Sequence, residues 1–192
     1  MFRPTGRTPT IGLILYPGGK VPPAAYAPAA REIAARASVL VEILDVPFNF
    51  AVFDIDAPNR VIAREPGIRR WAVGGHSLGG AMAAQYVASH PGRVVGLLFW
   101  ASYSATDLST SGVRVASIYG SLDPGAPKFT GSAARAALPA DTTFTPIAGG
   151  NHEQMGWYTG QPDDAQPSID RATQTEAVVA DSIAFLAGLA AP

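Results

Sequence analysis

Four glycines lie within three positions of Ser77, in the stretch VGGHSLGGAM at residues 73–82. Glycine weakens regular structure by about 0.5–1 kcal/mol relative to alanine, so this cluster indicates a backbone geometry that side chains would obstruct. An apolar, strand-like run precedes the serine at 70–75, and an apolar segment of helical length follows it. A sharp turn between a strand and a helix needs small residues on both sides, which Gly75 and Gly79 supply. The pattern predicts an exposed, nucleophilic serine hydroxyl, against the alternative of a purely structural glycine-rich turn.

A serine hydroxyl becomes a good nucleophile when a base takes its proton, and that base is most often histidine. The chain has three histidines. His76 is adjacent to Ser77, and because adjacent side chains diverge on a sharp turn, we expect it to pack or to form hydrogen bonds. His90 lies at the far end of the helix that follows the serine, about 20 Å away at 1.5 Å per residue. His152, in GGNHEQ, directly follows the last predicted strand and is therefore the predicted base.

The base needs a carboxylate to orient it, and three aspartates fit the chain order Ser, acid, His. Asp141 precedes the strand expected at 142–148 and so lies at the amino end of the sheet. Asp123 stands just past the carboxyl end of its strand, in the turn-rich segment IYGSLDPGAP. We therefore predict Asp123 as the acid. Asp107, which follows the preceding strand, is the alternative.

Acyl transfer to a serine also needs hydrogen-bond donors for the developing oxyanion. The backbone N–H of Leu78 is one candidate, because it begins a helix whose dipole favours negative charge. The second donor is expected from the loop after the first strand, LYPGGK, where Gly18 or Gly19 could present an N–H group. Pro17 has none. An ordinary Pro-Gly turn is the alternative for this loop.

These residues must be positioned by a sheet and helices. Short runs rich in apolar residues recur along the chain and are mostly continuous rather than alternating, as in the central strands of parallel sheets. Segments of helical length lie between them at 23–37, 78–89 and 169–190. The alternation predicts an α/β fold with a doubly wound sheet of about six mainly parallel strands flanked by helices. The predicted strands are 10–16, 38–44, 70–75, 93–100, 113–119 and 142–148.

Composition narrows the classes of partner. With 192 residues, 47% hydrophobic and 15% charged, the chain is expected to form a single domain over residues 1–192. The net charge of −1 and the lack of a basic run argue against nucleic-acid and membrane partners. There are no cysteines, which excludes disulfides and thiolate metal sites, and no metal or other cofactor is expected.

The apolar run at 11–16 is too short for a signal or membrane segment, so we expect a cytoplasmic protein. Its exposed sheet edge could form a homodimer.

Several separated motifs, in the right order, give the chain a resemblance to the α/β-hydrolase superfamily over nearly its whole length. It is most similar to the small lidless branch called alpha/beta hydrolase family 5, which is allied to dienelactone hydrolases. The resemblance implies a Ser–Asp–His triad and gives a second reason to choose Ser77, Asp123 and His152. The stretches that carry it are YPGG (16–19), AYAPAAREIAA (25–35), GGHSLGGAMAA (74–84), IYGSLD (118–123) and GGNHEQMGWY (149–158).

The chain also departs from its relatives. Tyr16 and Pro17 stand where typical esterases have His-Gly, which leaves the second oxyanion donor open. Dienelactone hydrolases use cysteine at the nucleophile position, so the serine argues against that reaction. The segment at 102–112 is too short for the helical cap of many lipases, so no cap domain is expected.

The expected function is hydrolysis of small carboxylic esters or thioesters through an acyl-enzyme, with a small acyl compound as substrate. The alternatives are a non-catalytic ligand-binding or sensor protein on the same fold, or a scaffold that acts through its surface. The loop at 156–168 is either a connector or part of the site rim. Expected rim residues, for which simple packing or solvation is the alternative, are Tyr16, Lys20, Phe48, Tyr103, Trp157 and Tyr158.

Overall fold

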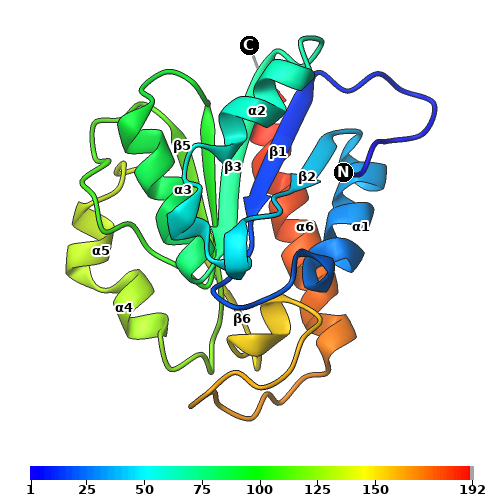
Figure 1. The fold of residues 1–192 in the computed structure, drawn as a ribbon. Helices are drawn as coiled ribbons and strands as arrows, with labels where there is room; N and C mark the ends of the chain where they lie inside the picture. The colour runs from blue at the N-terminus through cyan, green and yellow to red at the C-terminus, as the bar shows by residue number, and fades with distance from the viewer. Residues whose placement is uncertain (191–192) are drawn as a thin grey trace.

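The computed structural model, which describes residues 1–190, has six strands in one parallel sheet (Figure 1). Their order across the sheet is β2-β1-β3-β4-β5-β6. Each of the six predicted strands is present, with ends that differ by up to three residues. The strands are β1 (Ile11–Tyr16), β2 (Leu40–Ile43), β3 (Arg70–His76), β4 (Gly96–Trp100), β5 (Arg114–Gly120) and β6 (Thr143–Ile147).

The central strands are buried along almost their whole length. Every residue of β1 and β4 is buried, as is every residue of β3 except Arg70. Helices cover both faces of the sheet, so both alternating sets of side chains in these strands must be apolar or small. The edge strand β6 is only partly buried. This explains why the central strands read as continuous apolar runs in the sequence.

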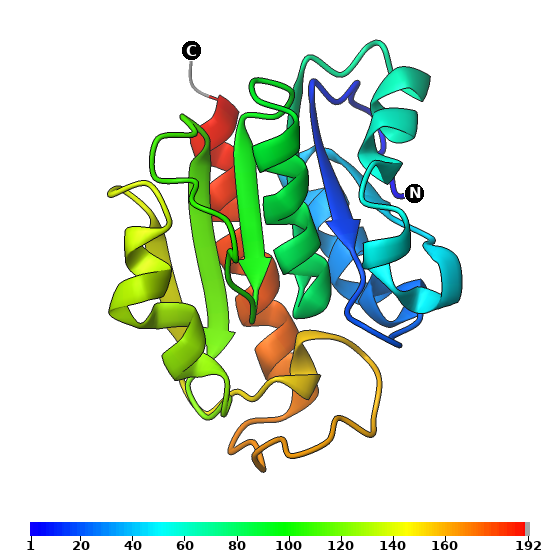
Figure 2. The ribbon, with the colours of Figure 1, turned by 60° about the vertical axis from the view of Figure 1, so that its left-hand side comes forward.

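The helices form two layers, one on each face of the sheet (Figure 2). Helices α1 and α6 pack against each other on one face, and α2 and α3 cover the other. The three predicted helices are confirmed, the first of them beginning as the 3₁₀ turn η1, whereas α2, α4 and α5 were not predicted. The helices are α1 (Ala27–Ala37), α2 (Ala57–Arg64), α3 (Leu78–Ser89), α4 (Ala126–Thr130), α5 (Ser132–Ala136) and α6 (Arg171–Ala190), with 3₁₀ turns η1 (Pro23–Tyr26), η2 (Pro47–Asn49), η3 (Ala51–Phe53) and η4 (Glu153–Met155).

A separate hydrophobic core fills each side of the sheet. Leu13 of β1 and Ile33 of α1 belong to the core under α1 and α6. Val73 of β3 and Tyr86 of α3 belong to the opposite core. The first core also contains a buried polar contact, in which Trp100 Nε1 donates to Ser182 Oγ at 3.1 Å. Burial on both faces fixes the register of the sheet, because a slip of one residue would exchange the two sets of side chains.

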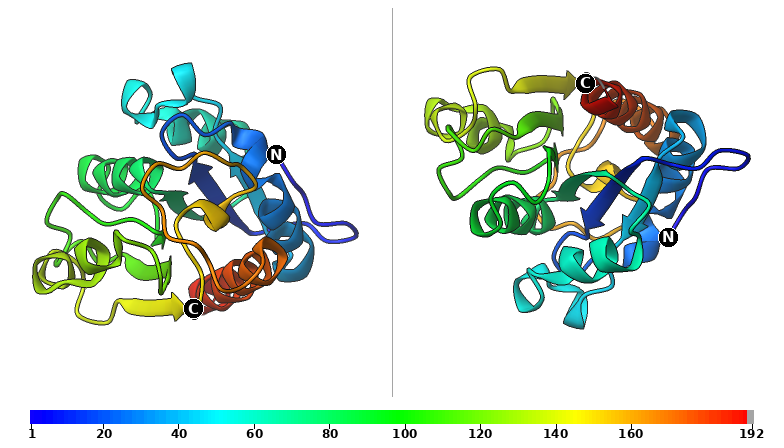
Figure 3. Two further views of the ribbon diagram at one scale, coloured as in Figure 1. Left: turned by 90° about the horizontal axis from the view of Figure 1, so that it is seen from below. Right: turned by 90° about the horizontal axis from the view of Figure 1, so that it is seen from above.

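The topology brings the loops after β1 and β3 together. The chain leaves β1 toward the α1 face and leaves β3 toward the α3 face, although β1 and β3 are neighbours in the sheet. Ligands of open parallel sheets bind at such a switch point, outside the carboxyl ends of the strands. Seen from below, the segment from η4 to the start of α6 lies across this edge of the sheet (Figure 3).

The segment between β4 and β5 is short and contains no helix in residues 101–113. The predicted absence of a cap at this position is therefore confirmed. None of the helices within residues 1–190 has the length and apolar character needed to cross a bilayer.

Candidate active site

Ser77 lies at the turn between β3 and α3 with a strained backbone. Its φ of 52° and ψ of −123° fall in a region that non-glycine residues rarely occupy, at a typical cost of about 1–3 kcal/mol. Neighbouring groups hold this conformation. The Ser77 N–H donates to the Trp100 carbonyl at 3.0 Å, and Ser102 Oγ donates to the Ser77 carbonyl at 2.6 Å. The turn thus depends on the end of β4 as well as on its own residues.

The glycines around the serine allow three backbone segments to meet. A Cβ atom at position 75 would lie 2.5 Å from the Gly79 carbonyl carbon, and one at position 79 would lie 2.3 Å from the Pro17 carbonyl oxygen. A Cβ atom at position 80 would lie 2.5 Å from the Ser102 side chain. Side chains are therefore excluded where the turn contacts itself and the loop after β1. This is the geometric requirement that the glycine cluster indicated.

The structure joins His152 to Asp123. The His152 Nδ1 atom lies 2.7 Å from Asp123 Oδ2, and both side chains are buried. Because an ionised carboxylate only accepts hydrogen bonds, Nδ1 carries the proton and Nε2 is left free to act as a base. The second Asp123 oxygen accepts the Gly125 N–H at 2.7 Å. The carboxylate is therefore fixed on both of its oxygens.

Two further side chains hold the histidine loop, and sequence reasoning missed both of them. The Gln174 amide of α6 accepts the Asn151 N–H at 3.0 Å and donates to the Asn151 carbonyl at 2.8 Å. Asp164 accepts the N–H groups of His152 at 3.1 Å and of Glu153 at 2.7 Å. Gln174 is fully buried. Neither residue belongs to a motif or to the apolar positions predicted for this helix, so no sequence pattern marked them.

Ser77, Asp123 and His152 line one cavity of about 350 Å³, which we call the His152 cavity. Gln161 and Asp163 from the loop at 156–168 line it as well, so this loop forms part of the rim. A second cavity of about 280 Å³, the Lys128 cavity, also opens onto Ser77. It is lined by Ser77, Leu78, Ala81, Ala101, Ser102, Tyr103, Lys128 and Phe129.

The candidate oxyanion donors differ in their surroundings. Leu78 is the first residue of α3, where an N–H group has no partner within the helix. The Gly18 N–H donates to the Tyr26 hydroxyl at 3.0 Å. The Gly19 N–H meets no acceptor within residues 1–190, and a Cβ atom at Gly19 would lie 3.2 Å from Leu78 Cδ2. Gly19 is therefore placed beside Leu78, and Gly18 already has a partner.

His76 is buried behind His152, and their rings are 4.6 Å apart. The Tyr26 hydroxyl accepts the Gly18 N–H and lies at hydrogen-bond distance, 2.8 Å, from His76 Nδ1. Burial, and secondarily the neighbouring His152, hold the pKa of His76 well below its ordinary value. His76 is therefore a neutral, hydrogen-bonded residue behind the site. The position of Tyr26 in an apolar helical pattern gave no sign of this contact.

The predicted rim residues lie in different places. Tyr103 lines the Lys128 cavity. Tyr16 is instead buried in the core, where its hydroxyl donates to the Ile55 carbonyl. Trp157 donates from Nε1 to Thr175 of α6 at 3.0 Å, and neither it nor the exposed Lys20 lines either cavity at Ser77.

Asp107 and His90 line neither cavity at Ser77. Asp107 is exposed and accepts the N–H of Ser109, not a histidine proton. His90 stacks on Tyr86 at the end of α3. Within residues 1–190 no group of three or more His, Asp or Glu side chains gathers as a metal site.

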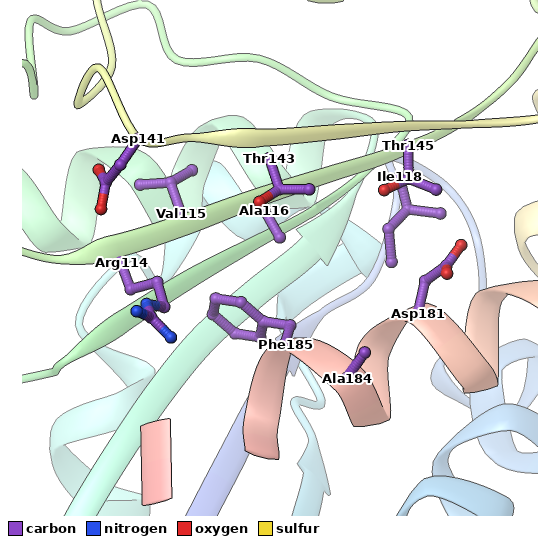
Figure 4. Close-up of a pocket in the computed structure, with 10 residues that line it drawn as sticks. All are labelled: Arg114, Val115, Ala116, Ile118, Asp141, Thr143, Thr145, Asp181, Ala184 and Phe185. Carbon is purple, nitrogen blue, oxygen red and sulfur yellow. The ribbon is translucent and has the colours of Figure 1, made fainter. Parts of the chain in front are cut away.

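A separate cavity of about 380 Å³ lies between the β5–β6 edge of the sheet and α6 (Figure 4). Phe185 stands in its middle, with Arg114 and Asp141 toward one end and Asp181 toward the other. Asp141 is thus at the amino end of β6, as predicted. Burial raises the pKa of Asp181. Ser77 does not line this cavity.

Comparison with known proteins finds one family. A model described as "Alpha/beta hydrolase family" matches residues 12–176. No curated protein matches the chain.

Solved structures share the fold at low sequence identity. A monoacylglycerol lipase from Paleococcus ferrophilus has a TM-score of 0.66 at 12% identity, over 91% of this chain and 94% of that one. An esterase domain of a Rhodothermus marinus protein has a TM-score of 0.65 at 14% identity, over 95% and 90%. The RedJ thioesterase of the Streptomyces coelicolor prodiginine pathway has a TM-score of 0.65 at 12% identity, over 95% and 88%. At such identities the likeness shows the fold alone.

Proposed function

The chain belongs to the alpha/beta hydrolase family, and we propose that it is a serine hydrolase that cleaves small carboxylic esters or thioesters. The family membership confirms the resemblance seen in the sequence motifs. The observation that carries the proposal is the buried 2.7 Å contact between His152 and Asp123, in a cavity that Ser77 shares. A strained serine, a histidine with a fixed tautomer and an oriented carboxylate are the parts that acyl transfer to serine needs.

In the acylation step, Ser77 Oγ attacks the substrate carbonyl carbon while His152 Nε2 accepts the hydroxyl proton. Asp123 stabilises the imidazolium that forms, through the Nδ1–H hydrogen bond, and itself remains ionised. The carbonyl oxygen becomes an oxyanion, which the N–H groups of Leu78 and Gly19 stabilise. We prefer Gly19 to Gly18 for the second donor because the Gly18 N–H is already bonded to Tyr26. The imidazolium then protonates the leaving group, and the acyl-enzyme remains.

In the deacylation step, His152 takes a proton from water, which attacks the acyl-enzyme carbonyl. The resulting tetrahedral intermediate collapses, Ser77 recovers its proton from His152, and the free acid leaves. These steps involve no redox change and use only the three side chains, the two backbone N–H groups and water.

Turnover separates this function from a non-catalytic sensor on the same fold. A hydrolase should release acid from short-chain ethyl and thioethyl esters over many turnovers, and Ser77→Ala should abolish the release. A sensor would form at most a single persistent adduct per chain. The expected cytoplasmic location, homodimer and lack of nucleic-acid or membrane partners remain predictions.

A further inference from the structure

The two cavities at Ser77 differ in chemistry, and Phe129 of α4 lies between them because it lines both. Its ring stacks on Tyr103 at 6.4 Å on one side and lies 6.3 Å from the His152 ring on the other. A substrate carbonyl held at Ser77 therefore has two directions in which its two substituents can extend.

The position of His152 decides which substituent enters which cavity. This step rests on the proposed function, in which the His152 imidazolium protonates the leaving group. The leaving group must then lie in the His152 cavity. The acyl chain extends the other way, into the Lys128 cavity, which His152 does not line.

The Lys128 cavity has apolar walls and one charge. Leu78, Ala81 and Ala101 give aliphatic surface, and Tyr103 gives an aromatic ring. The Lys128 ammonium lies 4.2 Å from the centre of that ring, a cation–π contact that holds it over the cavity. In the part of the chain that the structure describes, no carboxylate forms an ion pair with it. The aliphatic part of a short acyl chain would match the apolar walls of this cavity, and an anionic group at its end would match the Lys128 ammonium.

The His152 cavity carries the opposite charge. Asp163 and Asp164 both line it. The Asp164 carboxylate accepts three backbone N–H groups, from His152, Glu153 and Ala165. Asp163 is exposed, and none of the ion pairs within residues 1–190 includes it. A phosphorylated or otherwise anionic leaving group would be repelled here.

We propose that Lys128 and Asp163 set the substrate class. The Lys128 cavity receives a short acyl chain that ends in a carboxylate, and the His152 cavity receives an alcohol that is neutral or cationic. The preferred substrates are then monoesters of short dicarboxylic acids with uncharged or ammonium-bearing alcohols.

The acyl side is tested with two ethyl esters that differ in one group. Monoethyl glutarate carries a carboxylate, and ethyl glutaramate carries the isosteric neutral carboxamide. The wild type should show a kcat/KM about 2- to 5-fold higher for the carboxylate ester, the size expected for a partly exposed ion pair. The preference should shrink as salt is added, because salt screens exposed charges.

Lys128→Met should bring this ratio to about one by lowering kcat/KM for the carboxylate ester alone, and Lys128→Arg should keep the preference. Arg31→Met, which removes one positive charge from the exposed face of α1, is the matched control and should leave the ratio unchanged. Equal loss on both esters in Lys128→Met would mean a structural role for the lysine. That result, or a wild-type ratio of one or less, would overturn the acyl assignment.

The leaving-group side is tested with acetylcholine and its neutral isostere 3,3-dimethylbutyl acetate. Acetylcholine should be preferred about 2- to 5-fold, and Asp163→Asn should remove that preference. An unchanged ratio in Asp163→Asn would overturn this half of the proposal.

Labelling of Ser77 by a fluorophosphonate separates failure of this inference from failure of the proposed function. If Ser77 is labelled but neither glutaric ester is hydrolysed, the acyl assignment is tested by how much each ester slows the labelling of Ser77. Monoethyl glutarate must slow the labelling more than ethyl glutaramate does. Equal protection overturns the acyl assignment while leaving the serine hydrolase intact. If Ser77 is not labelled and no ester is cleaved, the proposed function itself fails, and the substrate assignment falls with it.

Discussion

The strained backbone at Ser77 predicts that its replacement by glycine stabilises the fold. Glycine adopts positive φ without steric cost, whereas alanine keeps the Cβ atom and therefore the strain. Ser77→Ala is thus the reference for Ser77→Gly, since both variants lack the hydroxyl and neither can form an acyl-enzyme.

The size of the effect follows from two opposing contributions. A φ of 52° with a ψ of −123° costs a non-glycine residue about 1–3 kcal/mol. Glycine loses about 0.5–1 kcal/mol more conformational entropy on folding. The middle values of these two ranges give a net gain in unfolding free energy of about 1.2 kcal/mol. For a chain of this size that corresponds to a Tm about 2–5 °C higher in Ser77→Gly than in Ser77→Ala.

Thermal unfolding followed by circular dichroism, with urea unfolding as a second measure, gives the comparison directly. Equal Tm values, or a lower Tm for Ser77→Gly, would refute the inference that the turn stores strain. Wild type should match Ser77→Ala within about 0.5 kcal/mol, because both side chains keep a Cβ atom.

Three further predictions concern residues around the site. Burial holds the pKa of His76 well below that of an unfolded histidine, so as the pH falls through about 6.5 the unfolded state takes up a proton before the folded state does. Between pH 7.5 and 5.5 wild type should therefore lose up to about 1.4 kcal/mol of unfolding free energy that His76→Gln retains, measured by urea unfolding at both pH values. Gln174→Leu leaves the Asn151 N–H and carbonyl without hydrogen-bond partners, which should lower the unfolding free energy by about 1–3 kcal/mol for each group. The loop that carries His152 should then shift and kcat should fall. Unchanged stability and kcat would show that the Gln174 hydrogen bonds do not position this loop. Phe48 is 83% exposed at a φ of 56°. Phe48→Gly should raise the unfolding free energy by about 0.5–1 kcal/mol, as relief of left-handed strain exceeds the entropy of glycine, and a lower Tm would contradict this.

The strands could be predicted from the sequence because a strand buried on both faces needs apolar or small residues at every position, and few other structural environments need such a continuous apolar run. Their ends were harder to locate. The run at 93–100 begins as a strand only at Gly96, since Arg93 and Val95 are exposed before it. Helices α4 and α5 have five residues each and are too short to show a helical period. Helix α2 carries a proline in its first turn, where helices tolerate it, within a segment of mixed polarity.

The placement of Ser77, Asp123 and His152 could be predicted because each follows the carboxyl end of a strand, and parallel strands bring those ends to one edge. The residues that hold them could not. Gln174 contacts a loop 23 residues earlier in the chain, and Asp164 contacts one 12 residues earlier. Such contacts depend on how a loop packs against a helix. This packing leaves no periodic pattern and no motif in the sequence. Tyr26 is a further example. In the sequence it belongs to an apolar helical pattern, which does not indicate that its hydroxyl contacts the Gly18 N–H and His76 Nδ1.

The most direct test of the proposed mechanism is covalent labelling of the folded protein with a fluorophosphonate, read by intact mass and peptide mapping. The wild type should gain one adduct per chain, on Ser77. His152→Ala, shown by circular dichroism to be folded, should gain none over the same time. No adduct on folded wild type, or undiminished labelling of Ser77 without His152, would contradict the activated serine.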